Sequence, residues 1–246
     1  MAELNIKLTV AYDGTAYHGW ANQPGLKTIH GTLVECFSRL FGRKVGICGA
    51  SRTDAGVHAL GQTANICIDT PIPVANMQSA MNSYLPKDIA VTSVEVAPRG
   101  FDPINHATGK HYRYTLNTAK VRPVHSINYC WHYPYTLDTD KMDRAGRLMR
   151  CTHDFRTFAS AKDHRRDSIR TLSRVDVRRE GDWIYIDVEG NRFMYNMVRN
   201  IAGTLVDIGR GRWVPEDITE MLEARDRRCA GQLAPPQGLC LVKVYY

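Results

Sequence analysis

Paired cysteines, an export signal and long apolar runs are all missing from this sequence of 246 residues. Its seven cysteines are scattered and none forms a Cys-x-x-Cys pair. That pattern argues against a disulfide framework and a cysteine-rich zinc site, and it favours a reducing compartment. Glu3, Asn5 and Lys7 interrupt the basic-then-apolar start of a signal peptide, and no apolar run approaches the ~18 residues that span a bilayer. We therefore expect a cytoplasmic protein without a membrane segment.

The sequence also lacks the motif of enzymes that use zinc to modify a nucleobase. The His-x-Glu and Pro-Cys-x-x-Cys pattern of the nucleobase deaminases is absent, and the histidines show no zinc-binding spacing. The sequence therefore predicts no metal site and removes the most obvious rival chemistry on a nucleobase.

Low-complexity tracts are lacking as well, and the composition is that of a folded protein, with 43% hydrophobic and 23% charged residues. The formal net charge is +7. A positive excess of this size is compatible with a polyanionic partner. By itself it does not separate a nucleic-acid-binding protein from the many basic proteins that bind none.

Periodic patterns divide the chain into two halves of similar make-up. Apolar alternation predicts strands, and helical spacing predicts helices. The expected strands are 6–12, 62–68, 89–96, 110–118, 172–179, 183–189 and 238–246, and the expected helices are 28–41, 74–84, 140–151, 193–208 and 215–223. Gly100 to Pro103 punctuates the chain, so we expect an N-terminal subdomain at 1–105 and a C-terminal subdomain at 106–246. The class is α+β, with two similar α/β subdomains whose mainly antiparallel sheets are flanked by helices.

One short stretch, Gly49 to Gln62, concentrates groups that perform chemistry. Asp54 stands two residues after Arg52 and two residues before Gly56. A guanidinium beside a carboxylate favours its ionised form, and a glycine lets a substrate approach the backbone. Asp54 is therefore either a nucleophile or general base, or a turn aspartate paired with Arg52 for stability.

Other candidate residues have ordinary structural explanations from the sequence alone. Tyr112 fits a half-buried strand aromatic. Arg199 fits a helix-surface charge, although buried-looking neighbours weaken that interpretation, and an isolated His58 is more often structural than catalytic. The charge-dense segment 161–170 is either a solvated loop or a phosphate-contacting one.

Six spaced motifs carry a resemblance that covers nearly the whole chain. Taken together and in order, they closely resemble the motifs of the tRNA pseudouridine synthase A family. The motifs are Gly49 to Gln62, Tyr12-Asp13-Gly14 with Tyr17 to Trp20, Lys110 to Tyr114, His153-Asp154-Phe155, Asn191 to Asn200, and Gly238 to Leu241.

The resemblance implies a fold of two α/β subdomains around an active-site cleft, assembled as a homodimer. It implies isomerisation of uridine to pseudouridine in the anticodon stem-loop of tRNA, at positions 38–40, without cofactor or metal. By resemblance Asp54 is the nucleophile, Tyr112 stacks on the target base, and Arg52 and Arg199 flank the catalytic group. Arg52 and Tyr112, together with His58 and Gln62, are the expected substrate-binding residues.

The residues leave the chemical route and the substrate open. A carboxylate at Asp54 is compatible with attack on the sugar C1′, attack on the base C6, or assistance to a glycal intermediate. Two alternatives stand beside the leading hypothesis: an isomerase acting at other uridines or on another RNA, and an RNA-binding or tRNA-folding protein whose catalysis is secondary.

Overall fold

The structure is a computed structural model and describes residues 3–246 of the chain. Two compact units make up the chain. The first contains the residues up to Thr108 together with Leu241–Tyr246, and the second contains Gly109–Cys240. Among the described residues, no helix is both long enough and apolar enough to cross a membrane.

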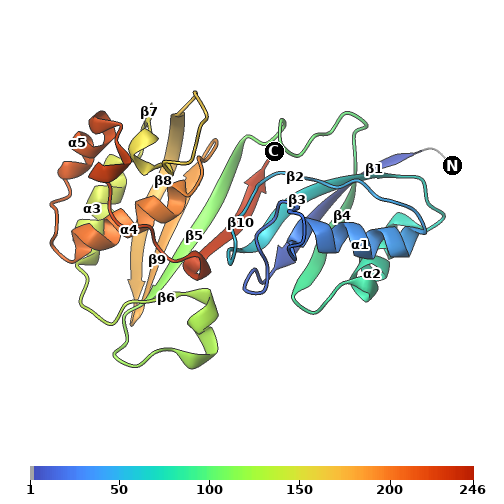
Figure 1. Ribbon diagram of the computed structural model, residues 1–246, viewed down its shortest axis with the longest axis horizontal. Coiled ribbons are helices and arrows are strands. Elements are labelled where there is room, and N and C mark those ends of the chain that lie inside the picture. Colours follow the sequence, from blue (N-terminus) through green and yellow to red (C-terminus); the bar gives the residue numbers. More distant parts are fainter. Residues whose placement is uncertain (1–2) are drawn as a thin grey trace. The chain divides into compact units, whose positions relative to one another are not determined.

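The first unit is a largely antiparallel sheet with two helices. Strand β1 pairs antiparallel with both β3 and β4, β2 pairs with β3, and the order of strands is β4-β1-β3-β10. Its elements are β1 (Leu4–Tyr12), α1 (Ile29–Phe41), β2 (Cys48–Gly49), β3 (His58–Ile68), α2 (Val74–Tyr84), β4 (Ile89–Ala97) and most of β10 (Leu239–Tyr245). Figure 1 shows α1 and α2 side by side against this sheet.

Alternation along β1 explains why the first sheet is covered on one face. Ile6, Leu8 and Val10 are fully buried, whereas the residues between them are partly exposed. Helix α1 buries its own apolar stripe and begins where Thr28 accepts a hydrogen bond from the backbone N–H of Gly31 at 3.2 Å. The helix ends at Gly42, whose φ of 65° is a left-handed conformation that glycine adopts without strain.

The second unit repeats the plan with more helices and a longer hairpin. Strands β5, β9, β8 and β7 are neighbours in that order and pair antiparallel, and the short β6 pairs parallel with β5. Its elements are β5 (Gly109–Asn117), η1 (Val124–Tyr129), β6 (Trp131–His132), α3 (Thr139–Leu148), β7 (Thr152–Asp154), η2 (Arg156–Phe158), β8 (Ile169–Glu180), β9 (Trp183–Gly190), α4 (Met197–Gly209), α5 (Asp217–Ala224), η3 (Arg227–Cys229) and η4 (Pro236–Gly238). The predicted α+β class with mainly antiparallel, helix-flanked sheets is confirmed.

Cross-strand register gives the second sheet one apolar and one charged face. Tyr112 pairs with Val188 and Tyr114 with Ile186, and all four side chains are buried. Helix α3 packs on this apolar side: a Cβ at Gly146 would stand 2.8 Å from the carbonyl oxygen of Val175. The intervening residues of the same strands carry charges on the other side.

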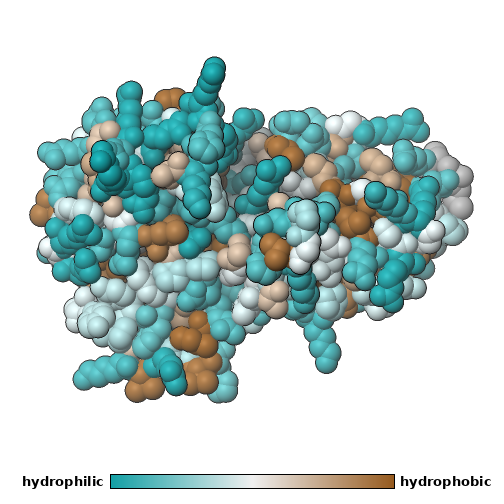
Figure 2. All heavy atoms as spheres, in the orientation of Figure 1, coloured by the Kyte–Doolittle hydropathy of each residue, from teal (hydrophilic) through white to brown (hydrophobic). Residues whose placement is uncertain are grey.

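Exposed apolar side chains gather on the segment around η1. Val121, Val124, Tyr129 and Tyr135 are all exposed. In Figure 2 the apolar colour collects over the lobe that contains η1. We call the surface formed by these four residues the η1 patch.

The two largest boundary differences from the sequence prediction are at the starts of β3 and α4. Strand β3 begins at His58 rather than at residue 62, because pairing with β1 extends the ladder to Ala59 despite the exposed Leu60. Helix α4 begins at Met197 rather than at residue 193, because Asn196 adopts a left-handed φ of 61° that breaks the helix.

Candidate functional site

The loop before β3 is fixed to the sheet through Gln62. The Ser51 N–H donates to Oε1 of Gln62 at 3.1 Å, and Nε2 of Gln62 donates to the Ser51 carbonyl at 2.6 Å. One residue earlier, the Ala50 N–H donates to the Thr63 carbonyl at 2.8 Å. The Gln62 side chain is fully buried. Both of its polar atoms therefore hold the backbone at the start of the loop.

The segment around Gly19 forms the second support of this loop. The Trp20 N–H donates to the Thr53 carbonyl at 3.0 Å. Gly19 has a φ of +87°, and a Cβ there would stand 2.5 Å from the Thr53 oxygen and 2.9 Å from the carbonyl carbon of Asp54. Only glycine permits that backbone approach. Gly19 thus lies directly against the backbone that carries the candidate catalytic carboxylate.

A tight turn presents Asp54 itself. The Val57 N–H donates to the Asp54 carbonyl at 3.1 Å, and the Gly56 N–H donates to the Tyr17 carbonyl at 3.2 Å. Gly56 has a φ of +76°, so the turn requires a glycine at this position for its backbone conformation. The Asp54 side chain is partly exposed. The result is a carboxylate on a rigid turn that retains access to solvent.

His58 follows the Asp54 turn and contacts the segment Asp13–Gly14. Its Nδ1 accepts a hydrogen bond from the Gly14 N–H at 3.1 Å and lies 3.2 Å from Oδ1 of Asp13. The His58 ring is buried. A Cβ at Gly14 would stand 2.0 Å from the Val57 carbonyl oxygen, so these two segments also meet at backbone distance. The geometry gives His58 a supporting position beneath the turn.

Arg52 does not pair with Asp54. No ion pair involves Arg52 in the part of the chain that the structure describes, so the pair that the spacing predicts is not formed. Ser51 and Thr53 on either side of Arg52 are buried, whereas Arg52 itself is exposed. In general, an exposed guanidinium is able to bind an external anion such as a phosphate.

Tyr112 and Arg199 belong to the second unit. The Tyr112 ring is buried and makes an edge contact with Phe193, with ring centroids 5.1 Å apart and planes at 78°. Arg199 lies in the first turn of α4 and donates from Nε to the Ala234 carbonyl at 2.8 Å and from Nη1 to Oδ1 of Asn196 at 3.2 Å. Both side chains are therefore held in place by their neighbours within the unit.

Asn196 is a supporting residue that the sequence analysis missed. Its left-handed backbone lies directly before α4, and its side chain accepts a hydrogen bond from Arg199. Asparagine tolerates this conformation better than other non-glycine residues, which is the one signal in the sequence that indicated it. Helical periodicity concealed it, because apolar residues continue through Phe193 and Met194.

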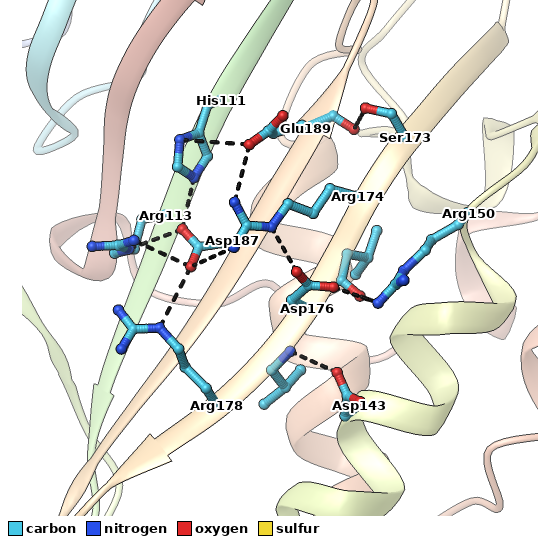
Figure 3. A network of polar contacts seen from close by, with 12 residues as sticks. His111, Arg113, Asp143, Arg150, Ser173, Arg174, Asp176, Arg178, Asp187 and Glu189 are labelled. Carbon is cyan, nitrogen blue, oxygen red and sulfur yellow. Dashed lines mark hydrogen bonds and ion pairs between the residues drawn. The ribbon is translucent and has the colours of Figure 1, made fainter.

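Figure 3 shows a network of charged side chains on the second sheet. By the alternation of β5 and β9, its members on these two strands lie on the face opposite Tyr112. Buried Asp187 accepts from Nε2 of His111 at 2.6 Å and from Nε of Arg113 at 2.9 Å, with Arg174 and Arg178 each at 3.8 Å. Burial alone would raise the pKa of Asp187, but the hydrogen bonds from His111 and Arg113 outweigh it and lower the pKa to about 2. The network stabilises the sheet and was not foreseen, because it depends on cross-strand register.

The expected site residues thus fall into two groups. Arg52, Asp54, His58 and Gln62 lie together in the first unit, and Tyr112 and Arg199 lie in the second. Within residues 3–246, no cluster of three or more histidine, cysteine or acidic side chains is arranged to hold a metal ion. What the first group offers chemically is a single accessible carboxylate on a backbone locked by glycines.

Comparison with known proteins identifies close relatives along the whole chain. Residues 8–102 and 147–246 match the family described as tRNA pseudouridine synthase. The chain is 43% identical over 244 residues to tRNA pseudouridine synthase A of Geobacillus kaustophilus, an alignment that covers 98% of this chain and 94% of the relative. It is 43% identical to the protein of the same name from Caldicellulosiruptor bescii, covering 98% and 99%. It is 41% identical to tRNA pseudouridine synthase A 2 of Clostridium perfringens, again covering 98% and 99%.

Proposed function

Because the chain belongs to the tRNA pseudouridine synthase family, whose members isomerise uridine in tRNA, we propose that Asp54 is the nucleophile of that reaction. One observation supports the proposal above the others. Asp54 is a partly exposed carboxylate on a turn that Gly19, Gly56 and Gln62 immobilise. Catalytic groups gain most when the protein fixes their geometry before the substrate arrives.

The reaction asks little of the protein beyond one ionised carboxylate. The bond between N1 of uracil and C1′ of ribose breaks, the base turns, and C5 bonds to C1′ while the C5 proton is lost and N1 gains one. No electrons are gained or lost overall and no water is consumed, so the proposal includes neither cofactor nor metal. The carboxylate must act while the detached uracil stays in the site.

From the family resemblance, we propose roles in binding or catalysis for three further side chains. Tyr112 supplies an aromatic face for the flipped base, and its edge contact with Phe193 holds the ring still. Arg199 contributes a guanidinium beside the reacting group. Exposed Arg52 contacts the RNA backbone.

His58 and Gln62 enter the proposal through the loop. Their polar atoms already bond to the backbone at Gly14 and Ser51, and both side chains are buried. They contribute to substrate binding by holding the Asp54 turn in its binding conformation. A direct contact with the RNA is not required of either.

The proposal also covers the part of the tRNA that is modified, the number of copies in the assembly and the cellular compartment. The target uridines lie in the anticodon stem-loop, as the sequence resemblance implies. Two copies associate, and the η1 patch is an apolar surface suited to such a contact. Cysteines within the described chain are all free thiols, which suits the reducing cytoplasm where tRNA is found.

Product mapping on unmodified tRNA tests the function. Wild-type protein should form pseudouridine in the anticodon arm, and Asp54→Asn should form none while still binding the tRNA. Pseudouridine elsewhere in the tRNA would favour an isomerase of different site choice. Absence of any product from the wild type would favour an RNA-binding protein and contradict the proposal. Sedimentation of the free protein measures whether two copies associate.

A further inference from the structure

The charge-dense segment 161–170 separates into buried anchors and exposed cations. Asp163, Ser168 and Arg170 are buried. Lys162, His164, Arg165 and Arg166 are exposed. An ordinary solvated loop has no reason to bury a carboxylate and a guanidinium, so the separation indicates a built structure.

Asp163 is the principal anchor of this loop. Its carboxylate accepts from Nε and Nη2 of Arg165, at 2.9 and 2.5 Å, and from the Tyr195 N–H at 2.8 Å. The pKa of Asp163 is held far below its usual range, chiefly by the hydrogen bonds from Arg165. In addition, the Ser160 N–H donates to the Tyr195 carbonyl at 2.8 Å. These bonds fasten the loop to the segment that leads into α4.

Two arginines extend the attachment. Nη1 of Arg156 donates to the Asp163 carbonyl at 3.1 Å, and Nη2 donates to the Arg165 carbonyl at 2.6 Å. Nη1 of Arg165 donates to the Phe193 carbonyl at 3.2 Å. Phe193 is the residue whose ring contacts Tyr112. A continuous chain of contacts therefore links the loop to the aromatic that the proposed function assigns to the flipped base.

Both acidic residues of the loop are already engaged. Asp163 pairs with Arg165, and Asp167 pairs with Arg170 at 3.2 Å. By contrast, Lys162, Arg166 and Arg192 form no ion pair among residues 3–246. Within the described part of the chain, these three positive charges therefore lack a counter-ion.

Lys110 shows that positive charge is concentrated around the loop. Burial, with Arg192 and Arg165 nearby, lowers the pKa of Lys110 to about 8. Like charges held this close destabilise one another in the free protein, and a bound polyanion relieves that repulsion.

We propose that the anchored loop selects the RNA: Lys162, Arg166 and Arg192 bind phosphates of the tRNA backbone, and Asp163 is the positioning residue that fixes them relative to Tyr112. The inference rests on the proposed function, because it assumes a tRNA whose target base lies at Tyr112. Phosphate contacts set register and orientation, and so they decide which nucleotide reaches the catalytic carboxylate.

Salt-dependent binding of unmodified tRNA tests the phosphate contacts without needing turnover. Replacing Lys162 and Arg166 by alanine should weaken binding roughly tenfold near physiological salt and reduce the slope of log K against log salt by about 1 to 2. KM should rise more than kcat falls. The matched control K44A/R99A removes the same charge at two exposed positions and should keep the wild-type affinity and slope. A K162A/R166A slope equal to that of the control would overturn the proposal.

Asp163→Asn tests the positioning role. It removes the charge that holds Arg165 and should raise KM and shift product among neighbouring uridines, with D163E restoring part of the wild-type distribution. Thermal melting of each variant separates this result from misfolding. An unchanged product distribution in a folded D163N protein would contradict the assignment. Failure of Asp54 as nucleophile is read from turnover, so it is distinguishable from failure of this loop, which is read from binding.

Discussion

The side-chain amide of Gln62 bonds to both the N–H and the carbonyl of Ser51, at 3.1 and 2.6 Å, and so replaces a strand neighbour that the loop lacks. This pairing makes the segment before Asp54 as well supported as a sheet edge, although it has no regular structure of its own.

Replacing Gln62 by leucine should therefore damage both stability and turnover. Two buried backbone groups would lose their partners, which costs about 2–4 kcal/mol of unfolding free energy in total. A loosened Asp54 turn should lower kcat roughly 10- to 100-fold with tRNA affinity largely kept. Urea unfolding and steady-state kinetics measure the two effects. The matched control is Q78L, whose exposed amide also bonds to backbone, at Val91 and Thr92, and which should cost less than about 1 kcal/mol.

Gly19→Ala should lower stability and activity more than the same substitution at Gly25, a glycine with a similar backbone conformation. Gly19 and Gly25 both have positive φ, +87° and +75°, but only Gly19 has backbone within 4 Å of an added Cβ. Alanine in this conformation costs roughly 1–2 kcal/mol at either site. At Gly19 the Thr53–Asp54 backbone must also shift, so G19A should lose additional stability and most of its activity. Equal kcat values for G19A and G25A would show that the contact does not position Asp54.

Acid stability should depend on Asp187. Because its pKa is lowered to about 2 in the folded state, from about 4 unfolded, it stabilises the protein above the unfolded value. That contribution, about 2 kcal/mol, is lost as the pH falls through the folded value. D187N should unfold more easily at pH 7 and lose less between pH 4 and pH 2 than the wild type does. The exposed pair of Lys7 and Glu95 supplies the control E95Q, expected within about 1 kcal/mol of wild type.

Arg52→Ala should affect RNA binding and not folding. Because Arg52 is exposed and unpaired in the described structure, its removal should change the unfolding free energy by less than about 0.5 kcal/mol. Loss of one phosphate contact should lower the salt slope of tRNA binding by about 1, with R52K retaining part of the effect. A drop of several degrees in Tm would reveal a structural partner and contradict this assignment.

Local pattern predicted much of the fold. Helix α2 begins and ends where periodicity placed it, at Val74 and Tyr84, and Thr28 caps α1 as its residue type suggests. These features depend on neighbours within a few residues. The last strand was also expected, but its place beside β3 in the first unit was not, because alternation does not specify a strand's neighbours.

The sequence predicted which residues form the candidate site, but it did not predict the contacts that they make. The motif indicated Asp54 and Arg52. Short spacing suggested an ion pair, but Arg52 lies exposed between the buried Ser51 and Thr53 and forms no ion pair among the described residues. The support from Gly19 comes from a residue far away along the chain. Gln62 and Ser51 both lie within the motif, but residue types alone do not show that their side-chain and backbone groups bond to each other. The network around Asp187 was not predicted either, because the partners of Asp187 lie on the neighbouring strands β5 and β8.

A single-turnover measurement with Asp54→Asn tests the central claim most directly. Excess enzyme is mixed with unmodified tRNA, pseudouridine is followed in time, and the Kd for the tRNA is measured in parallel. Asparagine keeps the shape of the side chain and removes its nucleophilic charge, so the rate should fall by at least about 10³-fold. The Kd should stay within about threefold of wild type. Pseudouridine formation within tenfold of the wild-type rate would contradict the role of Asp54 as the nucleophile.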